Sequence, residues 1–458
     1  MSLSSLFAIS PIDGRYSSKT IKLRCYFSEY AFLKFRVKIE ILWLKRILSL
    51  KSLGINYNSK IFKYLDNIII NFNEKDAYQI KKLEKKNNHD VKSIEYFLKN
   101  KLSKLLGKHS ILEFIHFSCT SEDINNLAYG LILKNSKKKL IIPIWKKILI
   151  EIKNMAFRYH DVPMLSRTHG QPATPTTMGK ELINFVYRLQ RQLKQFKNIE
   201  ILGKLNGSVG NYNAHYFSYS NLDWYKISQE FVNSLGLVWN PYTTQIEPHD
   251  YISEFFSCIS RVNTILIDFN RDIWGYISLN YFNQKLKIQE IGSSIMPHKI
   301  NPIDFENSEG NLGLSNAIIN YFIEKLPISR WQRDLSDSTV LRNIGTAISY
   351  SIIAYDSIIL GIKKLQINKK ILLKDLNRHW EVLAEPIQTI MRKYGVKNSY
   401  QKLKNLTRGK KITSNIILNY IKTLKIKDED KKKLINLTPE NYLGLASQLV
   451  KMFDKKIF

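Results

Sequence analysis

Hydrophobic residues recur at every third or fourth position over most of this chain, which is the spacing of amphipathic helices. The rhythm is clearest from Glu181 to Phe196, from Phe255 to Ile273, and in the stretch that begins after Asp337 and runs to Ile352. Two-residue alternation between hairpin turns is scarce, and Gly and Pro are few. The pattern therefore predicts an all-α protein built on long helices.

Several of these helices are apolar around most of their circumference. One partner face would not bury such a helix, so the pattern favours a helical bundle that extends into an oligomer interface. A chain of 458 residues is long enough for two or three domains and a large core. We therefore expect multidomain helical subunits that associate.

The composition, with 44% hydrophobic and 24% charged residues, is ordinary for a soluble globular protein. The start, Met1 to Ser10, lacks the basic region and the long apolar stretch of a secretory signal. No uninterrupted apolar run reaches membrane-spanning length. We expect a cytoplasmic protein that does not contact a membrane.

The formal charge of +31 raises the alternative of a nucleic-acid partner. The lysines are dispersed rather than gathered in one stripe, and no recognisable nucleic-acid-binding module is present, so a solvated basic surface is the better interpretation. The three cysteines, Cys25, Cys119 and Cys258, and the nine histidines show no paired ligand spacing. We expect neither a nucleic-acid partner nor a bound metal.

The stretch Gly292–Pro302 has a mixture of residues that no ordinary helix or strand needs. Its glycine and serine pair favour a polar loop, and Asn301 followed by Pro302 is typical of a helix start. The string resembles the signature G-S-S-x-M-P-x-K-x-N-P of the fumarase, aspartase and argininosuccinate lyase superfamily, whose members release fumarate by β-elimination. The resemblance implies that Ser293 is the base, and that Lys299 and Asn301 contact the substrate.

A second segment, S-R-T-H-G-Q-P-A, contains His169. Thr174 and Pro175 predict a helix start, which leaves His169 on the loop before it. A lone histidine is more often structural than catalytic, but this string closely resembles the segment of the adenylosuccinate lyase family that carries the general acid. The resemblance implies that His169 protonates the departing nitrogen.

Two segments offer helix starts with polar side chains. Thr120 and Ser121 precede acidic first-turn residues, and their hydroxyls and free amides would receive a carboxylate. The string is similar to the family stretch that holds the succinyl group. Asn88, His89 and Asp90 form either a plain helix cap or the family's H-D-V segment near the substrate phosphate.

The segment that discriminates best begins at Arg333. Ser336 or Asp337 can cap the following helix, so Ser338 and Arg342, four apart, would share one face near its positive end. A hydroxyl, a guanidinium group and first-turn amides make a phosphate site, with Arg333 as a second cation. A fumarate or aspartate lyase has no phosphate to bind, so the segment favours a nucleotide substrate.

The assignment of five further residues rests mainly on the resemblance. The opening S-P-I-D-G-R-Y matches a nucleotide-contacting segment of one bacterial subgroup, which implicates Arg15 and Tyr16. The family places Gln245 against the substrate, and Glu247 is similar to a carboxylate that orients the acid histidine; an exposed polar loop is an equal interpretation of both. His116 occupies a second family histidine position without an assigned role.

The resemblance covers essentially the whole chain, with its motifs in family order. It implies an N-terminal helical domain (1–113), a central long-helix bundle (114–365) and a C-terminal helical domain (366–458), in a homotetramer with a twenty-helix core and composite active sites. It also implies cleavage of adenylosuccinate to AMP and fumarate, and of succinyl-aminoimidazole-carboxamide ribotide, without a cofactor. An argininosuccinate or fumarate lyase and a catalytically silent structural member remain alternatives.

Overall fold

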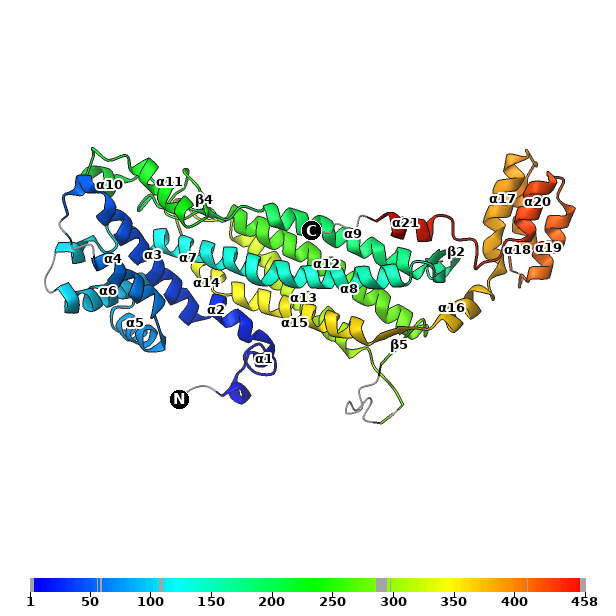
Figure 1. The fold of residues 1–458 in the computed structure, drawn as a ribbon, viewed down its shortest axis with the longest axis horizontal. Helices are drawn as coiled ribbons and strands as arrows, with labels where there is room; N and C mark the ends of the chain where they lie inside the picture. The colour runs from blue at the N-terminus through cyan, green and yellow to red at the C-terminus, as the bar shows by residue number, and fades with distance from the viewer. Residues whose placement is uncertain are drawn as a thin grey trace. The chain divides into compact units, whose positions relative to one another are not determined.

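The computed structural model describes residues 4–55, 57, 60–106, 110–285, 295–296, 298–409 and 411–453 (Figure 1). Helices dominate these residues, so the all-α prediction is confirmed, apart from three small two-stranded sheets. Contacts divide the chain into two compact units. Unit 1 comprises residues 1–145, 193–264 and 310–354, and unit 2 comprises residues 146–192, 265–309 and 355–458. The three-domain organisation stays a prediction.

Unit 1 is built mainly from the N-terminal helices and a short parallel strand pair. Its elements are η1 (Ser5–Phe7), α1 (Ser17–Thr20), η2 (Ile21–Leu23), α2 (Arg24–Phe27), α3 (Glu29–Ser49), η3 (Lys51–Leu53), α4 (Lys60–Ile70), α5 (Glu74–Asn87), α6 (Asp90–Leu106), η4 (Ser110–Phe114), α7 (Ser121–Ser136), η5 (Lys137–Ile141), β3 (Leu202–Gly203), α10 (Asn213–Ser218), α11 (Trp224–Ser234), β4 (Val238–Trp239) and α14 (Ser336–Leu341).

Unit 2 holds two antiparallel strand pairs and the C-terminal helices. Its elements are β1 (Pro163–Thr168), β2 (Gln171–Thr177), β5 (Phe282–Gln284), β6 (Leu365–Ile367), α16 (Lys369–Leu376), η6 (Trp380–Leu383), α17 (Ala384–Lys393), α18 (Ser399–Thr407), α19 (Ser414–Thr423), α20 (Asp428–Ile435) and α21 (Ala446–Met452). Five helices cross the division: α8 (Ile142–Arg158), α9 (Met178–Asn198), α12 (Asp250–Ser278), α13 (Ile303–Lys325) and α15 (Ile344–Lys364).

The N-terminal core of unit 1 forms around α3. Ser28 caps this helix, because its side chain accepts a hydrogen bond from Ala31 N at 3.1 Å. Apolar residues at helical spacing then pack against α4, α5 and α6, and the buried cluster includes Leu33, Val37 and Ile41. Arg36 lies among these apolar residues at 2% exposure, so a charge is buried inside this face of α3.

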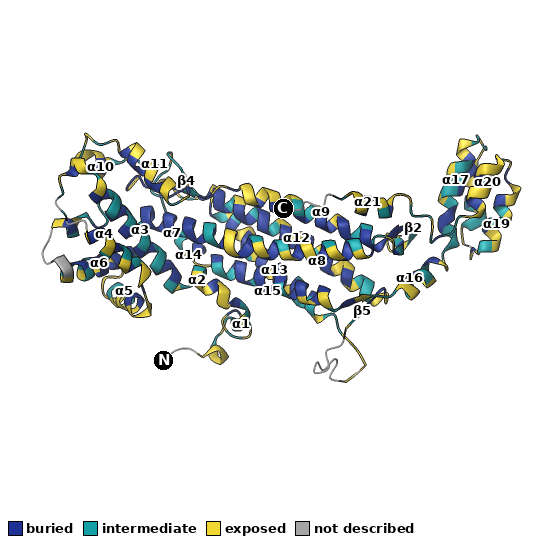
Figure 2. Cartoon of the chain, in the orientation of Figure 1, coloured by how far each residue is buried: buried dark blue, intermediate teal, exposed yellow. Residues whose placement is uncertain are grey.

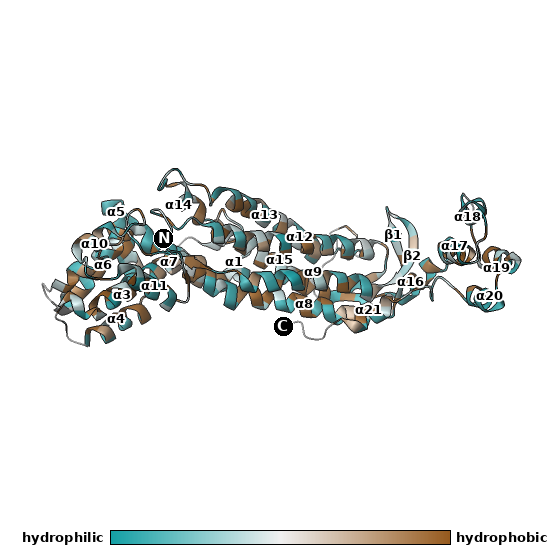
Figure 3. Cartoon of the chain, turned by 90° about the horizontal axis from the view of Figure 1, so that it is seen from above, coloured by the Kyte–Doolittle hydropathy of each residue, from teal (hydrophilic) through white to brown (hydrophobic). Residues whose placement is uncertain are grey.

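The long helices bury the faces that the sequence predicts. Leu182, Val186 and Phe196 on α9 are all at most 1% exposed, as are Phe255 and Phe269 on α12. Figure 2 shows buried residues in dark blue along α7, α12 and α15, and Figure 3 shows hydrophobic and hydrophilic sides on the helices. The helical periodicity in these stretches is therefore confirmed.

A buried polar cluster within unit 1 fixes the mutual register of α12, α13 and α15. Asn263 Nδ2 donates to Ser351 Oγ at 3.0 Å, and Ser315 Oγ lies 2.7 Å from Ser351 Oγ. Ser315 Oγ also donates to the carbonyl of Ala347 at 2.9 Å. A slip of any one helix would leave these buried groups without hydrogen bonds, which is costly.

The stretch Ser336–Lys364, which contains α14 and α15, is long and apolar enough to cross a membrane by length and composition. The sequence expectation concerned uninterrupted apolar runs and is not contradicted, because Arg342 and Asp356 interrupt this stretch. In the structure, 72% of its apolar window is buried inside the protein. Core helices of soluble proteins have this property, so we interpret α15 as a bundle helix.

The approach of α9 to α8 in unit 2 yields a stability prediction. A Cβ at Gly179 would lie 2.3 Å from Ala156 O and 2.5 Å from His160 Cα, so both would have to move. Gly179→Ala should lower the free energy of unfolding by about 1–3 kcal/mol, measured by urea denaturation. Gly275→Ala is the control, because nothing lies within 4 Å of that site. Equal stability of the two variants would contradict the prediction.

Candidate active site

The start of α7 is fixed by a carboxylate with four donors. Asp123, which is fully buried, accepts from the backbone N–H groups of Thr120 (2.8 Å), Asn206 (3.0 Å) and Gly207 (3.1 Å), and pairs with Lys204 Nζ at 2.9 Å. Thr120 is the N-cap residue, as the sequence predicts. This arrangement leaves Thr120 and Ser121 half-buried at the amide end of the helix.

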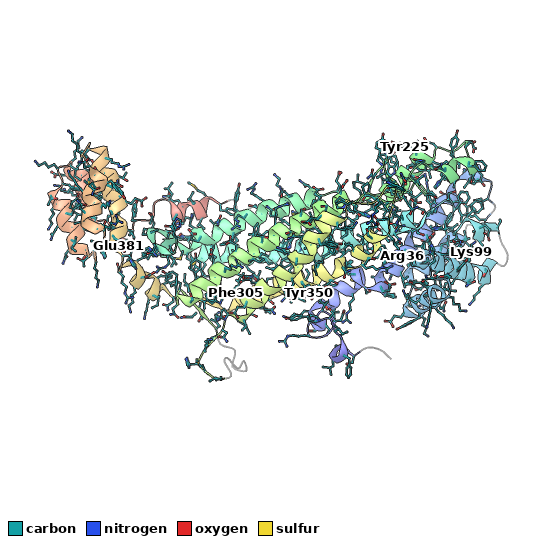
Figure 4. All side chains as sticks on the ribbon, turned by 180° about the vertical axis from the view of Figure 1, so that it is seen from behind. Arg36, Lys99, Tyr225, Phe305, Tyr350 and Glu381 are labelled. Atoms are coloured by element: carbon teal, nitrogen blue, oxygen red, sulfur yellow. The ribbon has the colours of Figure 1, made fainter. Side chains whose placement is uncertain are left out.

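A second ion pair joins α3, α6 and α7. Arg36, labelled in Figure 4, donates from Nε to Asn125 Oδ1 at 2.8 Å, and from Nη2 to Asp90 Oδ2 at 2.6 Å. Burial alone would raise the pKa of Asp90, but the charge and hydrogen bond of Arg36, the backbone N–H of Val91 and the charge of Arg342 together hold that pKa below its usual range. The preceding residues Asn88 and His89 are exposed.

Arg342 is a second, more exposed cation beside Asp90. Its guanidinium lies 3.6 Å from Asp90 and 3.8 Å from Glu29, and its side chain is 45% exposed. Arg342 lines two pockets of unit 1, of about 140 and 310 Å³. The larger one is also lined by Ser10 and Asp13, which belong to the same N-terminal segment as Arg15 and Tyr16. The structure therefore places Arg342 beside the N-terminal motif.

Arg333 is held separately from Arg342. Its Nη2 lies 3.0 Å from Glu122 Oε1, and its Nη1 donates to Gln245 Oε1 at 3.2 Å. Gln245 also donates from Nε2 to the carbonyl of Ser208 at 3.0 Å. The structure thus brings together two residues predicted to bind substrate, Arg333 and Gln245, while Arg342 has different partners.

The prediction for the helix after Arg333 needs a correction. Neither Ser336 nor Asp337 caps α14; Leu335 is the N-cap residue, and Asp334 Oδ1 accepts from Ser336 N at 2.7 Å. The helix ends at Leu341, so Arg342 is its C-cap and does not lie near its positive end with Ser338. Asp337 is instead turned into the protein, where it is 2% exposed.

Two histidines in unit 1, the half-buried His116 and the buried His249, have carboxylate partners. His116 Nδ1 lies 2.6 Å from the fully buried Glu40; burial alone would lower the pKa of His116, but Glu40 raises it. His249 lies between Glu247 and Asp337. Glu247, which was expected to orient the acid histidine, therefore has His249 as its histidine partner within this unit.

His169 lies at the tip of a hairpin in unit 2, which corrects the predicted helix start at Thr174 and Pro175. Those residues belong to β2, and α9 begins only at Met178. Thr168 pairs with Gln171, so His169 and Gly170 form a two-residue turn, with φ of 53° and 73°. This turn leaves the His169 side chain exposed.

The C-terminal part of unit 2 anchors both strands of this hairpin. Arg167 on β1 pairs with Asp375 of α16 at 2.5 Å, and the Tyr281 hydroxyl donates to the same carboxylate. Thr174 on β2 donates to Glu385 of α17 at 2.5 Å. These contacts hold the segment that carries His169.

The remaining predicted residues follow β5. Lys299 is exposed and Asn301 is half-buried, just before α13. Ser293 lies outside the described residues. Among the residues that the structure describes, no group of three or more His, Cys, Asp or Glu side chains could hold a metal ion.

Sequence reasoning missed the buried charges that support the site. Arg36 and Glu40 lie four apart inside the apolar face of α3, and this interruption of an apolar stripe was an available signal. His249 and Asp337 are 88 residues apart in sequence, so their contact had no local signal.

Comparisons with known proteins identify the family to which this chain belongs. A family model described as "Lyase" matches residues 14–317, and one described as "Adenylosuccinate lyase C-terminal" matches residues 329–443. The chain is 73% identical over 454 residues to the adenylosuccinate lyase of Buchnera aphidicola subsp. Baizongia pistaciae, covering 99% of both chains. The chain belongs to the adenylosuccinate lyase family.

A further relative agrees with this placement, and solved structures show the same fold. The adenylosuccinate lyase of Escherichia coli strain K12 is 55% identical over 453 residues, covering 98% of this chain and 99% of that one. Two solved structures share the fold: a 3-carboxy-cis,cis-muconate lactonizing enzyme from Pseudomonas putida (TM-score 0.74, 18% identity, 94% and 95% covered) and a fumarate lyase from Mesorhizobium sp. BNC1 (TM-score 0.73, 16% identity, 94% and 96% covered).

The pair of Arg36 and Asp90 yields a pH-dependent prediction. Asp90→Asn should lower the free energy of unfolding by roughly 3 kcal/mol at neutral pH, because the buried guanidinium loses its counter-charge. The folded-state pKa of Asp90 is depressed, so the difference from wild type should persist above the ordinary carboxyl pKa of about 4 and shrink as the pH falls below it.

Urea denaturation across this pH range measures the effect. Asp66→Asn is a matched control, since Asp66 pairs with Lys45 at 2.7 Å but its side chain is 47% exposed. Exposed pairs contribute only about 0–1 kcal/mol. A loss for Asp90→Asn no larger than that of the control would contradict the prediction.

Proposed function

We propose that this chain catalyses the reaction for which its family is named. It is a carbon–nitrogen lyase that eliminates fumarate from adenylosuccinate, giving AMP, and from succinyl-aminoimidazole-carboxamide ribotide, in purine nucleotide synthesis. The observation that carries the proposal is full-length identity of 55–73% to adenylosuccinate lyases. Two pairs of predicted site residues that lie together, Arg342 with Asp90 and Arg333 with Gln245, support it.

The chemistry requires a base, an acid and fixed positive partners. A proton leaves the carbon beside a carboxylate, and the developing negative charge needs preorganised hydrogen-bond donors. Ser293 takes this proton, and His169 gives a proton to the departing nitrogen. Thr120 and Ser121, at the amide end of α7, receive the succinyl carboxylates together with Lys299 and Asn301.

The nucleotide end of the substrate binds to polar groups of unit 1 other than those that receive the succinyl carboxylates. Arg342 takes the phosphate, since its side chain is 45% exposed and its ion pairs are long. Arg15, Tyr16 and Ser338 assist it, and Arg333 with Gln245 contacts the remainder of the substrate. Asn88, His89 and Asp90 complete the phosphate side.

The enzyme acts as a cytoplasmic homotetramer with composite active sites. Exposed apolar side chains on the long helices support association, among them Trp274 at 48%, Leu314 at 54% and Tyr321 at 54% exposure. The predicted acid lies in unit 2 and most predicted substrate contacts lie in unit 1, so sites that combine residues of several chains suit this distribution.

The proposal is tested by fumarate release from adenylosuccinate, argininosuccinate and malate, followed by ultraviolet absorbance. We expect release from adenylosuccinate alone. Release from argininosuccinate or malate alone would instead establish a sibling lyase, and release from none of the three substrates would indicate a catalytically silent member.

The acid and base assignments predict large losses of turnover. His169→Ala and Ser293→Ala should each reduce kcat by roughly a hundredfold to ten-thousandfold, the usual contribution of one acid–base group. Substrate binding, measured by calorimetry, should survive in both. Near-full kcat for Ser293→Ala on both substrates would remove that residue from the role of base.

Composite sites predict complementation between inactive variants. His169→Ala and Ser293→Ala protein, mixed and reassembled, should regain part of the wild-type activity, because some sites then combine an intact histidine with an intact serine. Each variant reassembled alone is the control. Sedimentation that found a fully active monomer would refute the composite site.

The assignment of Arg342 predicts a phosphate-specific loss. A charge-assisted contact contributes about 1.5–3 kcal/mol, so Arg342→Ala should weaken substrate binding roughly tenfold to a hundredfold. An analogue without the 5′-phosphate should bind wild type and variant about equally. An equal loss for both ligands, or a much lower melting temperature, would make Arg342 a structural residue.

A further inference from the structure

His249 is enclosed with two carboxylates in the interior of unit 1. His249, Glu247 and Asp337 are each at most 2% exposed. The backbone N–H of His249 donates to Glu247 Oε2 at 2.8 Å, and ring atom Nδ1 lies 3.7 Å from the same oxygen. On the other edge of the ring, Nε2 lies 3.3 Å from Asp337 Oδ2. Charges removed from water in this way must compensate one another.

The imidazole ring carries a positive charge in this environment. Burial alone would lower the pKa of His249, but the two carboxylates outweigh burial and raise it to about 9. Tyr251, buried beside Glu247, stays neutral because burial raises the pKa of its phenol. Arg333 approaches Asp337 at 3.9 Å. Because Glu122 lies 3.0 Å from the same Arg333 nitrogen, these two cations face three carboxylates.

The cluster of His249, Glu247 and Asp337 contacts residues that we assign to substrate binding. Asp337 Oδ1 accepts from the backbone N–H of Ser338 at 2.7 Å and is the atom that Arg333 approaches. Arg333 in turn donates to Gln245 at 3.2 Å. The two carboxylates lie on opposite edges of the His249 ring, so their oxygens do not converge on one point as cation binding would require.

We propose that His249 is a positioning residue for the substrate-binding side of the active site. Its ring holds the Asp337 carboxylate in place, and Asp337 fixes Ser338 and Arg333 where they meet the substrate. Glu247 supplies the second counter-charge of the ring. The inference rests on the function proposed above, which assigns Ser338, Arg333 and Gln245 to substrate binding.

The test is the steady-state kinetics of His249→Gln in the full-length protein. Loss of one charged hydrogen-bonding group should raise KM for adenylosuccinate roughly tenfold to a hundredfold, while kcat stays nearly constant because the proton-transfer groups are untouched. The variant leaves Glu247 and Asp337 without the cation between them.

A charge-matched double variant separates positioning from packing. His249→Gln combined with Glu247→Gln removes one positive and one negative charge, so KM should return toward wild type. Asp337→Asn should raise KM by a factor similar to that of His249→Gln, and it keeps the proposal testable if the latter does not fold.

His215→Gln is the matched control. His215 is also fully buried in unit 1, but it packs against Trp43 and Trp224, and its pKa is lowered to about 4 by burial, so it is neutral. Its replacement should lower the melting temperature and leave KM near the wild-type value. A rise in KM for His249→Gln that the double variant does not relieve, or a wild-type KM in Asp337→Asn, would overturn the proposal. A wild type that releases no fumarate would instead contradict the proposed function.

Discussion

Charges withdrawn from water need partners of opposite sign, and this constraint organises unit 1. A series of ion pairs and hydrogen bonds runs from the interior to the exposed Arg342 and Glu29, in the order Glu247, His249, Asp337, Arg333, Glu122, Asn125, Arg36, Asp90, Arg342 and Glu29. Each cation of the series approaches at least two acceptors, and removing a buried partner would leave a charge without compensation. Arg333, which is assigned to the substrate, therefore takes its orientation from the buried carboxylates of Glu122 and Asp337.

The two arginines assigned to the substrate occupy different positions in this series. Arg333 has a 17% exposed side chain and a close contact with Glu122, whereas Arg342 is 45% exposed and its ion pairs are 3.6–3.8 Å long. Exposed ion pairs contribute little free energy, so Arg342 can exchange its carboxylates for a phosphate at small cost. Arg333 is better suited to holding a fixed geometry. We predicted from the sequence that both arginines belong to one phosphate site, because the sequence shows their spacing but not the groups with which they pair.

Local signals predicted local structure well. The periodic stretches became buried helices, and Thr120 caps α7, because both depend on residues within a few positions of one another. The hairpin of His169 was missed because Thr174-Pro175 suits a helix start as well as a strand, and the contact of β2 with α17 that favours the strand comes from about 200 residues later. The partners of His249 were beyond sequence reasoning for the same reason. The assigned base, Ser293, lies outside the described residues, so its role rests on resemblance.

The distribution of groups between the units has an evolutionary consequence. The His169 hairpin is anchored by Asp375 and Glu385 in unit 2, whereas Arg342, Arg333 and Gln245 belong to unit 1. Under the proposed function, substitutions that alter nucleotide recognition can therefore accumulate in unit 1 while the proposed proton donor keeps its support in unit 2. A scaffold of this kind can acquire new substrates by gradual change, because nucleotide recognition and proton transfer need not be rebuilt together.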